Sequence, residues 1–335
     1  MRKRLTLADV ARSAGVSMMT VSRAINNKPG LSDELRQKIL QIAVEIGYQA
    51  ESDTREQSSQ RTFTIGVIVA DITIPFFSQI VRGIEDVCYE FGYHMYLANT
   101  GEDLERERHA LNDLLQHDLD GAILCSPRAP MDELVAILQQ LPAAVLINRD
   151  VRTPLPNVVT VNVNDQRGAQ SAVQHLIAIG RKRIAYIGGP ANSTSNQRRH
   201  EGYRQALKNA NIAYDPQLVV NVLNVDGVRP ATQELLNRFP ELDGIFLFSD
   251  QLAISVMQTC QENGRSIPID IALVSADDIP LASAMRPQLT TLRVNLSHIG
   301  RLSMRTLLEM IEGEATAASF QIEPELIIRS SSQPS

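Results

Sequence analysis

The sequence predicts an α/β protein with three parts: an N-terminal three-helix headpiece containing a helix-turn-helix, a polar linker, and a two-lobed body of doubly wound parallel sheets. In the first 50 residues, apolar residues recur at helical spacing between capping residues and glycines. The next stretch, residues 51–62, is polar and has no apolar periodicity. From residue 63 onward, short β-branched runs alternate with helical patterns, and this alternation restarts in the second half.

The first two helices make the predicted helix-turn-helix. Thr6 is a candidate cap for the first helix, and Gly15 ends it because glycine takes the left-handed conformation at little cost. Ser17 caps the second helix, which turns Val21 inward. The outward positions carry small hydroxyls and one guanidinium, which can bind phosphates and read a guanine edge in the major groove. A plain helical hairpin with a solvated face is the alternative.

A third helix is predicted over residues 32–46. Ser32 caps its start, Asp33 and Glu34 suit the positive helix N-terminus, and Gly47 ends it. Together the three helices make a headpiece of residues 1–50. It carries eight Lys or Arg against four acidic residues, a net charge of +4, while the whole chain carries −6, which leaves −10 on the remaining residues. This asymmetry indicates a basic DNA-binding module joined to an acidic body.

Four motifs at fixed spacing resemble the opening signature of the lactose-repressor family of bacterial transcription regulators. They are LADVA at residues 7–11, AGVS at 14–17, TVSR at 20–23, and Asn26. The resemblance covers nearly the whole chain and implies a homodimer on a two-fold symmetric operator in double-stranded DNA. It puts Met18 and Met19 at the family's sequence-reading positions and leaves Arg23 as the best polar base contact. The implied DNA-binding residues are Thr6, Ser17, Met18, Met19, Thr20, Ser22, Arg23 and Asn26.

The linker departs from the family pattern. In the family this segment folds into a hinge helix on DNA, and a leucine enters the minor groove. The family also shows Pro-Asn soon after the headpiece tyrosine, whereas Tyr48 is followed here by Gln49 and Ala50. Gln57 stands where the leucine is expected. Residues 51–62 are therefore read as a hinge or linker of atypical sequence.

The body alternates strands with helices, which predicts parallel sheets covered on both faces. Its first half has predicted strands at 65–69, 93–98, 121–125 and 143–147, and helices through 80–87, at 104–117 and at 131–140. Its second half has predicted strands at 183–187, 218–222, 245–248 and 273–276, and helices at 165–179, 197–209, 228–238 and 251–263.

The family resemblance implies how these elements assemble. It predicts a periplasmic-binding-protein-like body in which residues 63–162 and 293–322 form the first lobe, and residues 163–292 and 323–331 form the second. It also implies that the segment at 289–293 and the helix at 298–311 cross back to complete the first lobe.

A ligand site is predicted between the lobes, because open α/β sheets bind ligands beyond the carboxyl ends of their strands. Polar side chains follow the predicted strands, and carboxylates with an arginine suit a polyhydroxylated ligand. The family pattern matches Arg199 and Asp277 individually, together with Asp71, Phe76 and Arg149. The candidate effector-binding residues are Asp71, Phe76, Ser126, Asn148, Arg149, Arg199, Asp226, Ser249, Asp250 and Asp277. For any one of them, the alternative is a strand-end charge that pairs with a neighbour.

The predicted pocket is more polar than in many relatives, which stack an aromatic ring on the ligand. The chain has no tryptophan, Asp226 stands near that position, and Ala276 replaces a second aromatic. The expected effector is a small molecule, a sugar or sugar derivative, and the polar pocket leaves a charged ligand open as well.

Two other classes of function fit less well. The one glycine-rich strand exit that an enzyme could use, residues 187–190, lacks a GxGxxG pattern, and Pro190 has no N–H to offer a phosphate. The histidines show no triad or metal spacing, and the three cysteines, Cys88, Cys125 and Cys260, show no CxxC spacing. We therefore expect no catalysis, no cofactor and no metal.

A sugar-binding transport protein is the other class. It would carry a signal peptide, and Asp9 and Arg12 interrupt any apolar run behind the basic N-terminus. No run of about 20 apolar residues could span a membrane. The sequence therefore predicts a cytoplasmic protein, and its tail lacks the heptads of a coiled-coil tetramer.

Overall fold

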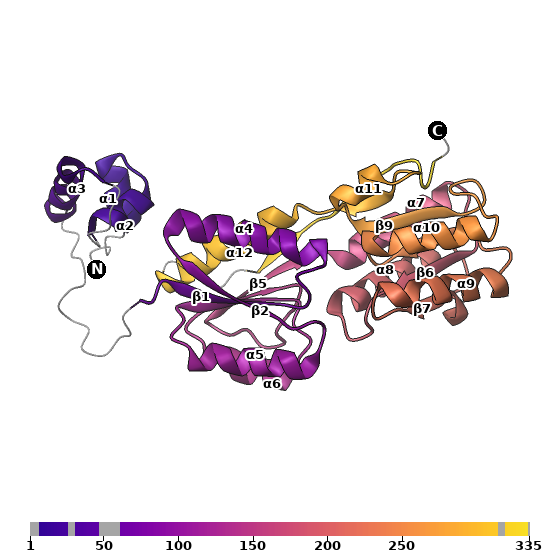
Figure 1. Ribbon diagram of the computed structural model, residues 1–335, viewed down its shortest axis with the longest axis horizontal. Helices are drawn as coiled ribbons and strands as arrows, with labels where there is room; N and C mark the ends of the chain where they lie inside the picture. The colour runs from indigo at the N-terminus through magenta and orange to yellow at the C-terminus, as the bar shows by residue number, and fades with distance from the viewer. Residues whose placement is uncertain (1–6, 26–30, 47–60, 314–318, 334–335) are drawn as a thin grey trace. The chain divides into compact units, whose positions relative to one another are not determined.

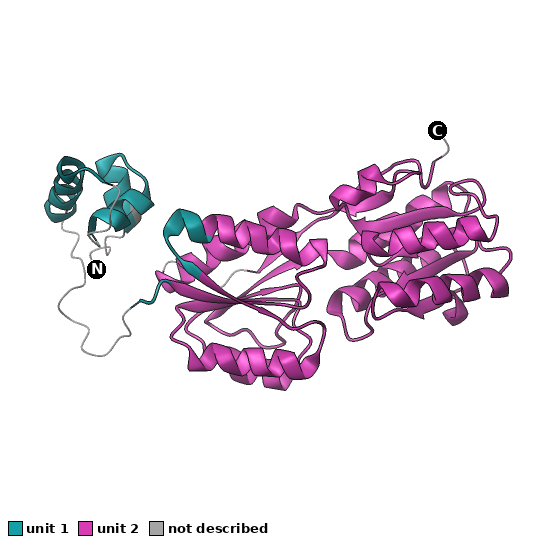
Figure 2. Ribbon diagram, in the orientation of Figure 1, with its two compact units in different colours: residues 1–63, 88–94 teal, residues 64–87, 95–335 magenta. Residues whose placement is uncertain are grey.

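The computed structural model describes residues 7–25, 31–46, 61–313 and 319–333. The chain divides into two compact units, residues 1–63 with 88–94, and residues 64–87 with 95–335 (Figure 2). The three N-terminal helices belong to the first unit. Two six-stranded sheets with their helices make up nearly all of the second. Within the described ranges, no helix is long and apolar enough to cross a membrane.

The headpiece consists of α1 (Leu7–Ala14), α2 (Met18–Ile25) and α3 (Asp33–Glu45). Gly15 follows α1 with φ at +66°, the left-handed conformation that was predicted. The Ser17 hydroxyl accepts a hydrogen bond from the Thr20 amide at 3.2 Å, and the Ser32 hydroxyl accepts one from the Leu35 amide at 3.3 Å. The predicted caps of α2 and α3 are therefore confirmed.

One apolar face from each helix forms the headpiece core. Val10, Val21 and Ile39 come from the three helices in turn, and none of them is exposed to solvent. Small residues beside them, such as Ala24, let the helices approach closely. The candidate residues Thr6 and Asn26, Gly47, and most of the linker lie outside the described residues.

The first sheet has the strand order β11-β5-β4-β3-β1-β2. Its strands are β1 (Thr64–Val69), β2 (His94–Asn99), β3 (Gly121–Cys125), β4 (Ala144–Ile147), β5 (Val158–Val163) and β11 (Phe320–Ile322). The registered pairs β1 with β3, β3 with β4, β4 with β5, and β5 with β11 are all parallel. The four strands predicted in the first half are confirmed, whereas the sequence did not predict β5 or β11.

Helices cover both faces of this sheet (Figure 1). They are α4 (Pro75–Phe91) and α12 (Leu296–Ile311) on one face, and α5 (Leu104–Gln116) and α6 (Met131–Leu138) on the other. The two helices of the first face cross at paired glycines. A Cβ on Gly83 would lie 2.1 Å from the Ser297 carbonyl oxygen, and one on Gly300 would lie 2.1 Å from the Ile80 carbonyl oxygen. The backbones of α4 and α12 are therefore in direct contact, and α12 also packs against β3, β4 and β5.

The second sheet has the order β12-β10-β9-β8-β6-β7, and its β10–β12 pair is antiparallel. Its strands are β6 (Ile184–Gly188), β7 (Val219–Asn221), β8 (Gly244–Leu247), β9 (Ala272–Asp277), β10 (Thr290–Arg293) and β12 (Glu325–Ile327). The other registered pairs, β6 with β7, β6 with β8, β8 with β9 and β9 with β10, are parallel. The four strands predicted in the second half are confirmed.

Alternate residues of these strands build two cores. Tyr186 and Phe246 pack toward α7 and α8, while Ile187 and Leu247 pack toward α9 and α10. The helices are α7 (Asp165–Ala178), α8 (Thr194–Asn209), α9 (Val228–Arg238), α10 (Ala253–Glu262) and α11 (Pro280–Ala284), with short 3-10 helices η1 (Pro216–Leu218), η2 (Val225–Gly227) and η3 (Asp250–Leu252). Helix α8 begins three residues earlier than predicted, and this extension brings its first turn to the site described below.

Candidate functional site

The outer surface of α2 carries the first group of candidate residues. Ser17 is exposed, and its hydroxyl lies 2.8 Å from that of Thr20. Ser22 and Arg23 are half-buried. Arg36 of α3 donates hydrogen bonds to the carbonyl oxygens of Arg23 and Ala24, at 3.2 and 3.4 Å, and so satisfies the end of α2. This anchor fixes the end of α2 that presents Arg23.

The two methionines of α2 differ in their surroundings. Met18 packs against the apolar core of the headpiece. Met19 is half-exposed and does not belong to that core, as far as the described residues show. An apolar contact with a base edge can therefore be made more readily by Met19 than by Met18.

The second group lines a cavity of about 500 Å³ formed by residues of both sheets. Loops after the carboxyl ends of β1, β2 and β3 contribute from the first sheet, and loops after β6, β7 and β8, with the last residue of β9, contribute from the second. Six predicted residues line it: Asp71, Phe76, Ser126, Arg199, Ser249 and Asp277. Ser126 and Asp277 both have positive φ values, +55° and +109°, a conformation that non-glycine residues rarely adopt and that often occurs at functional sites.

Arg199 is the charged centre of the second-sheet wall. Its Nε donates to Asp165 at 2.8 Å, its Nη2 donates to Asp277 at 3.2 Å, and its Nη1 donates to the Phe248 carbonyl oxygen. The guanidinium carbon lies 4.9 Å from the centre of the Phe248 ring. Burial opposes the charge, but Asp165 and Asp277 together raise the pKa of Arg199 above its ordinary value. Arg199 is therefore a permanent cation between two carboxylates.

Burial also acts on Asp277 itself. It raises the pKa of this carboxyl to about 6, although Arg199 opposes the shift. The two carboxylates share one arginine, and Asp165 has the shorter contact. Asp277 is therefore the less firmly held of the two, and it is the one that lines the cavity.

Arg128 is the charged centre of the first-sheet wall, and the sequence did not predict it. Its Nε and Nη2 donate to the two oxygens of Glu102 at 2.9 and 3.0 Å, a bidentate pair. Its Nη1 donates to the Ser126 carbonyl oxygen at 2.9 Å. The buried Glu107 accepts from the amides of Arg128 and Ala129, and so fixes the loop that follows β3.

Asp71 and a set of apolar side chains complete the walls. One Asp71 oxygen accepts from the Thr73 amide at 2.9 Å and from the Thr73 hydroxyl at 2.8 Å. Phe76 and Phe77 meet edge to face, with ring centres 5.2 Å apart. Leu223 lines the cavity although it is 80% exposed, and no sequence motif marks it.

Two predicted residues after β4 do not line the cavity. Asn148 is buried, and its Oδ1 accepts a hydrogen bond from the Val163 amide at 2.9 Å, which ties the end of β4 to β5. Arg149 donates to the Ala129 carbonyl oxygen at 3.1 Å and to the Thr194 hydroxyl at 3.0 Å. Asn148 thus holds the strand ends, and Arg149 connects the first-sheet loops to the start of α8.

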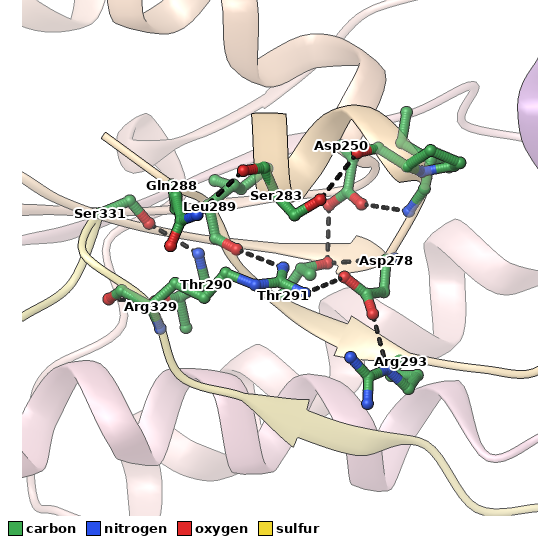
Figure 3. Close-up of polar contacts among 12 residues, drawn as sticks. Asp250, Asp278, Ser283, Gln288, Leu289, Thr290, Thr291, Arg293, Arg329 and Ser331 are labelled. Carbon is green, nitrogen blue, oxygen red and sulfur yellow. Dashed lines mark hydrogen bonds and ion pairs between the residues drawn. The ribbon is translucent and has the colours of Figure 1, made fainter. Parts of the chain in front are cut away.

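Asp226 and Asp250 also lie away from the cavity. Asp226 is exposed in η2, and Leu223, three residues earlier, lines the cavity instead. Asp250 is fully buried, where its carboxylate accepts from the Ile279 amide at 2.9 Å and from the Thr291 hydroxyl at 2.6 Å (Figure 3). Burial, followed by the charge of Asp277, raises the pKa of Asp250 to about 7.

Asp278 holds the crossing segments together. It accepts from Arg293 Nε at 2.6 Å and from Arg329 Nη2 at 2.7 Å (Figure 3). Arg293 ends β10, after which the chain passes to α12, and Arg329 follows β12, on the returning segment. Asp278 is thus next to the cavity residue Asp277 in sequence but serves the connection between the two sheets.

Metal binding has no support in the geometry. Among the residues that the structure describes, no group of three His, Cys, Asp or Glu side chains is arranged to hold an ion. Cys88, Cys125 and Cys260 are buried and separate. The charged centres of the cavity are instead arginine–carboxylate pairs.

The chain is similar to known proteins in both sequence and fold. Residues 6–51 match the model described as bacterial regulatory proteins, lacI family, and residues 173–332 match a periplasmic binding protein-like domain. The ribose operon repressor of Halalkalibacterium halodurans is 34% identical over 97% of this chain and 96% of its own length. A solved complex of the transcriptional regulator CelR with cellobiose is 30% identical, covers 98% of this chain and 100% of its own, and has a TM-score of 0.74. A lac repressor dimer bound to operator and the anti-inducer ONPF is 25% identical, covers 98% and 99%, and has a TM-score of 0.75.

Proposed function

Because this chain belongs to the lacI family of bacterial regulatory proteins, which are DNA-binding transcription regulators, we propose that it is a cytoplasmic repressor controlled by a small-molecule effector. Two copies bind a two-fold symmetric operator, and a sugar or sugar derivative in the cavity sets the operator affinity. The observation that carries this proposal is that two buried arginines, Arg128 and Arg199, reach one cavity from two different sheets.

The cavity walls support a polyhydroxylated effector. The Asp71 carboxylate can accept hydrogen bonds from ligand hydroxyls, and the hydroxyls of Ser126 and Ser249 can accept or donate them. The rings of Phe76 and Phe248 offer apolar surface to the C–H face of a sugar. The solved relatives include the CelR complex with cellobiose and a regulator from Alkaliphilus metalliredigens complexed with D-xylulofuranose. We infer that the six predicted residues that line the cavity contact the effector.

The headpiece supports a specific DNA contact. Ser17, before the start of α2, and Thr20 and Ser22 on α2 offer hydroxyl donors to phosphates or bases, and the Arg23 guanidinium can read guanine. We propose that residues 1–50 bind the operator, with Thr6 and Asn26 among the contacts, and that residues 51–62 transmit the state of the body. In this proposal residues 63–162 with 293–322, and 163–292 with 323–331, are the two lobes that close on the effector.

The switch follows from a ligand that touches both walls. Such a ligand binds a closed arrangement more tightly than an open one and therefore shifts the population toward closure. The change in the open–closed free-energy difference equals the difference in the ligand's binding free energy for the two states. An effector must therefore contact both the wall that carries Arg128 and the wall that carries Arg199 in order to act. The change would then reach the headpiece through the linker.

A binding selection on random duplex DNA tests the proposal. The full chain is incubated with the library at fixed near-physiological salt, because phosphate contacts alone retain DNA at low salt. We expect one inverted repeat to be enriched, and its retention to change when cellobiose, D-ribose or another sugar of a neutral panel is added. Retention without sequence preference would reject specific binding to an operator. A specific site whose retention no cavity ligand alters would reject effector control.

A further inference from the structure

The cations at the cavity are fully engaged by the protein's own carboxylates. Among the described residues that line it, the only positively charged side chains are Arg128 and Arg199. Their side chains are 5% and 4% exposed. Glu102 occupies Arg128 through both of its oxygens, and Asp165 with Asp277 occupies Arg199. An anionic ligand would have to displace one of these buried pairs.

The remaining polar groups of the cavity comprise one carboxylate, Asp71, and uncharged serine, asparagine and glutamine side chains. Asp71 is half-exposed, and only one of its oxygens receives the hydrogen bonds from Thr73. The lining carries three carboxylates against two guanidiniums, so its net charge is −1 with Asp71 and Asp277 ionised. Such a wall attracts hydroxyl donors and repels phosphate or carboxylate groups.

The N-terminus of α8 is the feature of the wall that favours anions, and neighbouring polar groups reduce its effect. Helix α8 begins at the cavity, and the N-terminus of a helix attracts negative charge. The hydroxyl of its N-cap, Ser193, already accepts from the Asn196 amide at 3.3 Å, and Asp277 lies at the same wall. The helix end is therefore partly satisfied and faces a carboxylate.

We propose that Glu102 is a specificity-determining residue: by neutralising Arg128, it makes the cavity reject phosphorylated and other anionic ligands and select uncharged polyhydroxylated ones. The inference rests on the proposed function, since it takes this cavity as the effector site. Glu102 affects the selection against anions more than Asp277 does, because the Arg128 guanidinium has one carboxylate partner whereas the Arg199 guanidinium has two. Without Glu102, the cation keeps only the Ser126 carbonyl oxygen.

Replacing Glu102 with Gln tests this assignment, because glutamine keeps the size of the side chain and removes its charge. The full chain is titrated calorimetrically with inorganic phosphate and with D-ribose 5-phosphate. We expect no saturable binding of either probe to the wild type at millimolar concentration. E102Q should bind both about tenfold or more tightly than the wild type, because a freed guanidinium gives charge-assisted hydrogen bonds to phosphate.

Glu262→Gln is the matched control, since it removes a carboxylate from an exposed pair with Arg229 at 2.6 Å. It should behave as the wild type. If E102Q fails a thermal-unfolding check, Glu102→Gly gives a second test, because it removes the same carboxylate and glycine takes the positive φ of +60° at this position without strain. A folded charge variant that gains no phosphate binding, or saturable phosphate binding to the wild type, would overturn the proposal. These titrations do not involve DNA, so failure of effector control appears separately, as operator binding that no ligand changes.

Discussion

Removing the charge of Arg199 should destabilise the body as well as abolish its response to ligand. The side chains of its partners, Asp165 and Asp277, are 1% and 6% exposed. Methionine is similar in length and uncharged, so Arg199→Met removes the cation without emptying the space. Breaking a buried ion pair from one side costs about 3–5 kcal/mol, because the other charge stays buried and unpaired. We expect that loss in the free energy of unfolding at pH 7.

The deficit of this variant should grow with pH. Burial already raises the pKa of Asp277 to about 6, and the loss of Arg199 removes the main influence that lowers it. A carboxyl whose folded pKa exceeds its unfolded value of about 3.9 binds its proton more tightly in the folded state. The stability it contributes is present at low pH and is lost as pH rises through the folded pKa. R199M should therefore be closest to the wild type near pH 5 and furthest from it near pH 8.

Urea unfolding followed by near-ultraviolet circular dichroism measures this difference. The buried side chains of Tyr186 on β6 and Tyr203 on α8 lie in one core cluster and report on the second sheet. Adding Asp165→Asn to R199M should recover about 1–3 kcal/mol, since it removes one of the two unpaired charges. A variant within about 1 kcal/mol of the wild type at pH 8, or a deficit equal at pH 5 and pH 8, would refute the argument from buried charge.

Three further predictions concern other parts of the chain. Arg23→Ala should cost roughly 1–3 kcal/mol of specific operator binding and little non-specific binding, as measured by titration of both DNAs at one salt concentration. For Asp250→Asn, the free energy of unfolding relative to that of the wild type should increase by about 2–4 kcal/mol from pH 4 to pH 8. The reason is that the folded pKa of Asp250 is about 7, so the wild type loses the contribution of this carboxyl as pH rises, and urea unfolding at the two pH values measures the change. Gly83→Ala should destabilise the body by about 1–3 kcal/mol or more, because its Cβ would lie 2.1 Å from the Ser297 carbonyl oxygen, and thermal unfolding would reveal it.

The sequence predicted most of the helices and strands because local signals mark them, but it did not predict α11. Ser17, Ser32 and Gly15 take the capping and left-handed roles that their chemistry favours. Strand β5 was missed although it is apolar, because only Asn164 separates it from α7 and no glycine or proline follows to mark the boundary. Strands β11 and β12 have three residues each, too few for a periodic signal.

The candidate site was harder to predict because strand ends carry both structural and ligand-facing polar groups. Asn148 and Ser126 each follow a strand and each have positive φ, yet one is turned onto β5 and the other reaches the cavity. Glu102 and Arg128 were missed because their bidentate contact joins loops 26 residues apart in sequence. Only the packed sheet brings that pair together, so neither residue type nor spacing could reveal it.

Consecutive arginines of α8 connect ligand recognition to the contact between the sheets. Arg199 faces the cavity, while Arg198 donates to Asp150 at 2.5 Å and to Asn162 at 3.1 Å, beside β4 and on β5. The Arg198–Asp150 pair is partly exposed and contributes about 0–1 kcal/mol, whereas the Arg199 pairs are buried and costly to break. We expect a ligand that displaces α8 to break the weak Arg198 contacts and to leave the buried Arg199 pairs intact, because the two sets of contacts differ in strength.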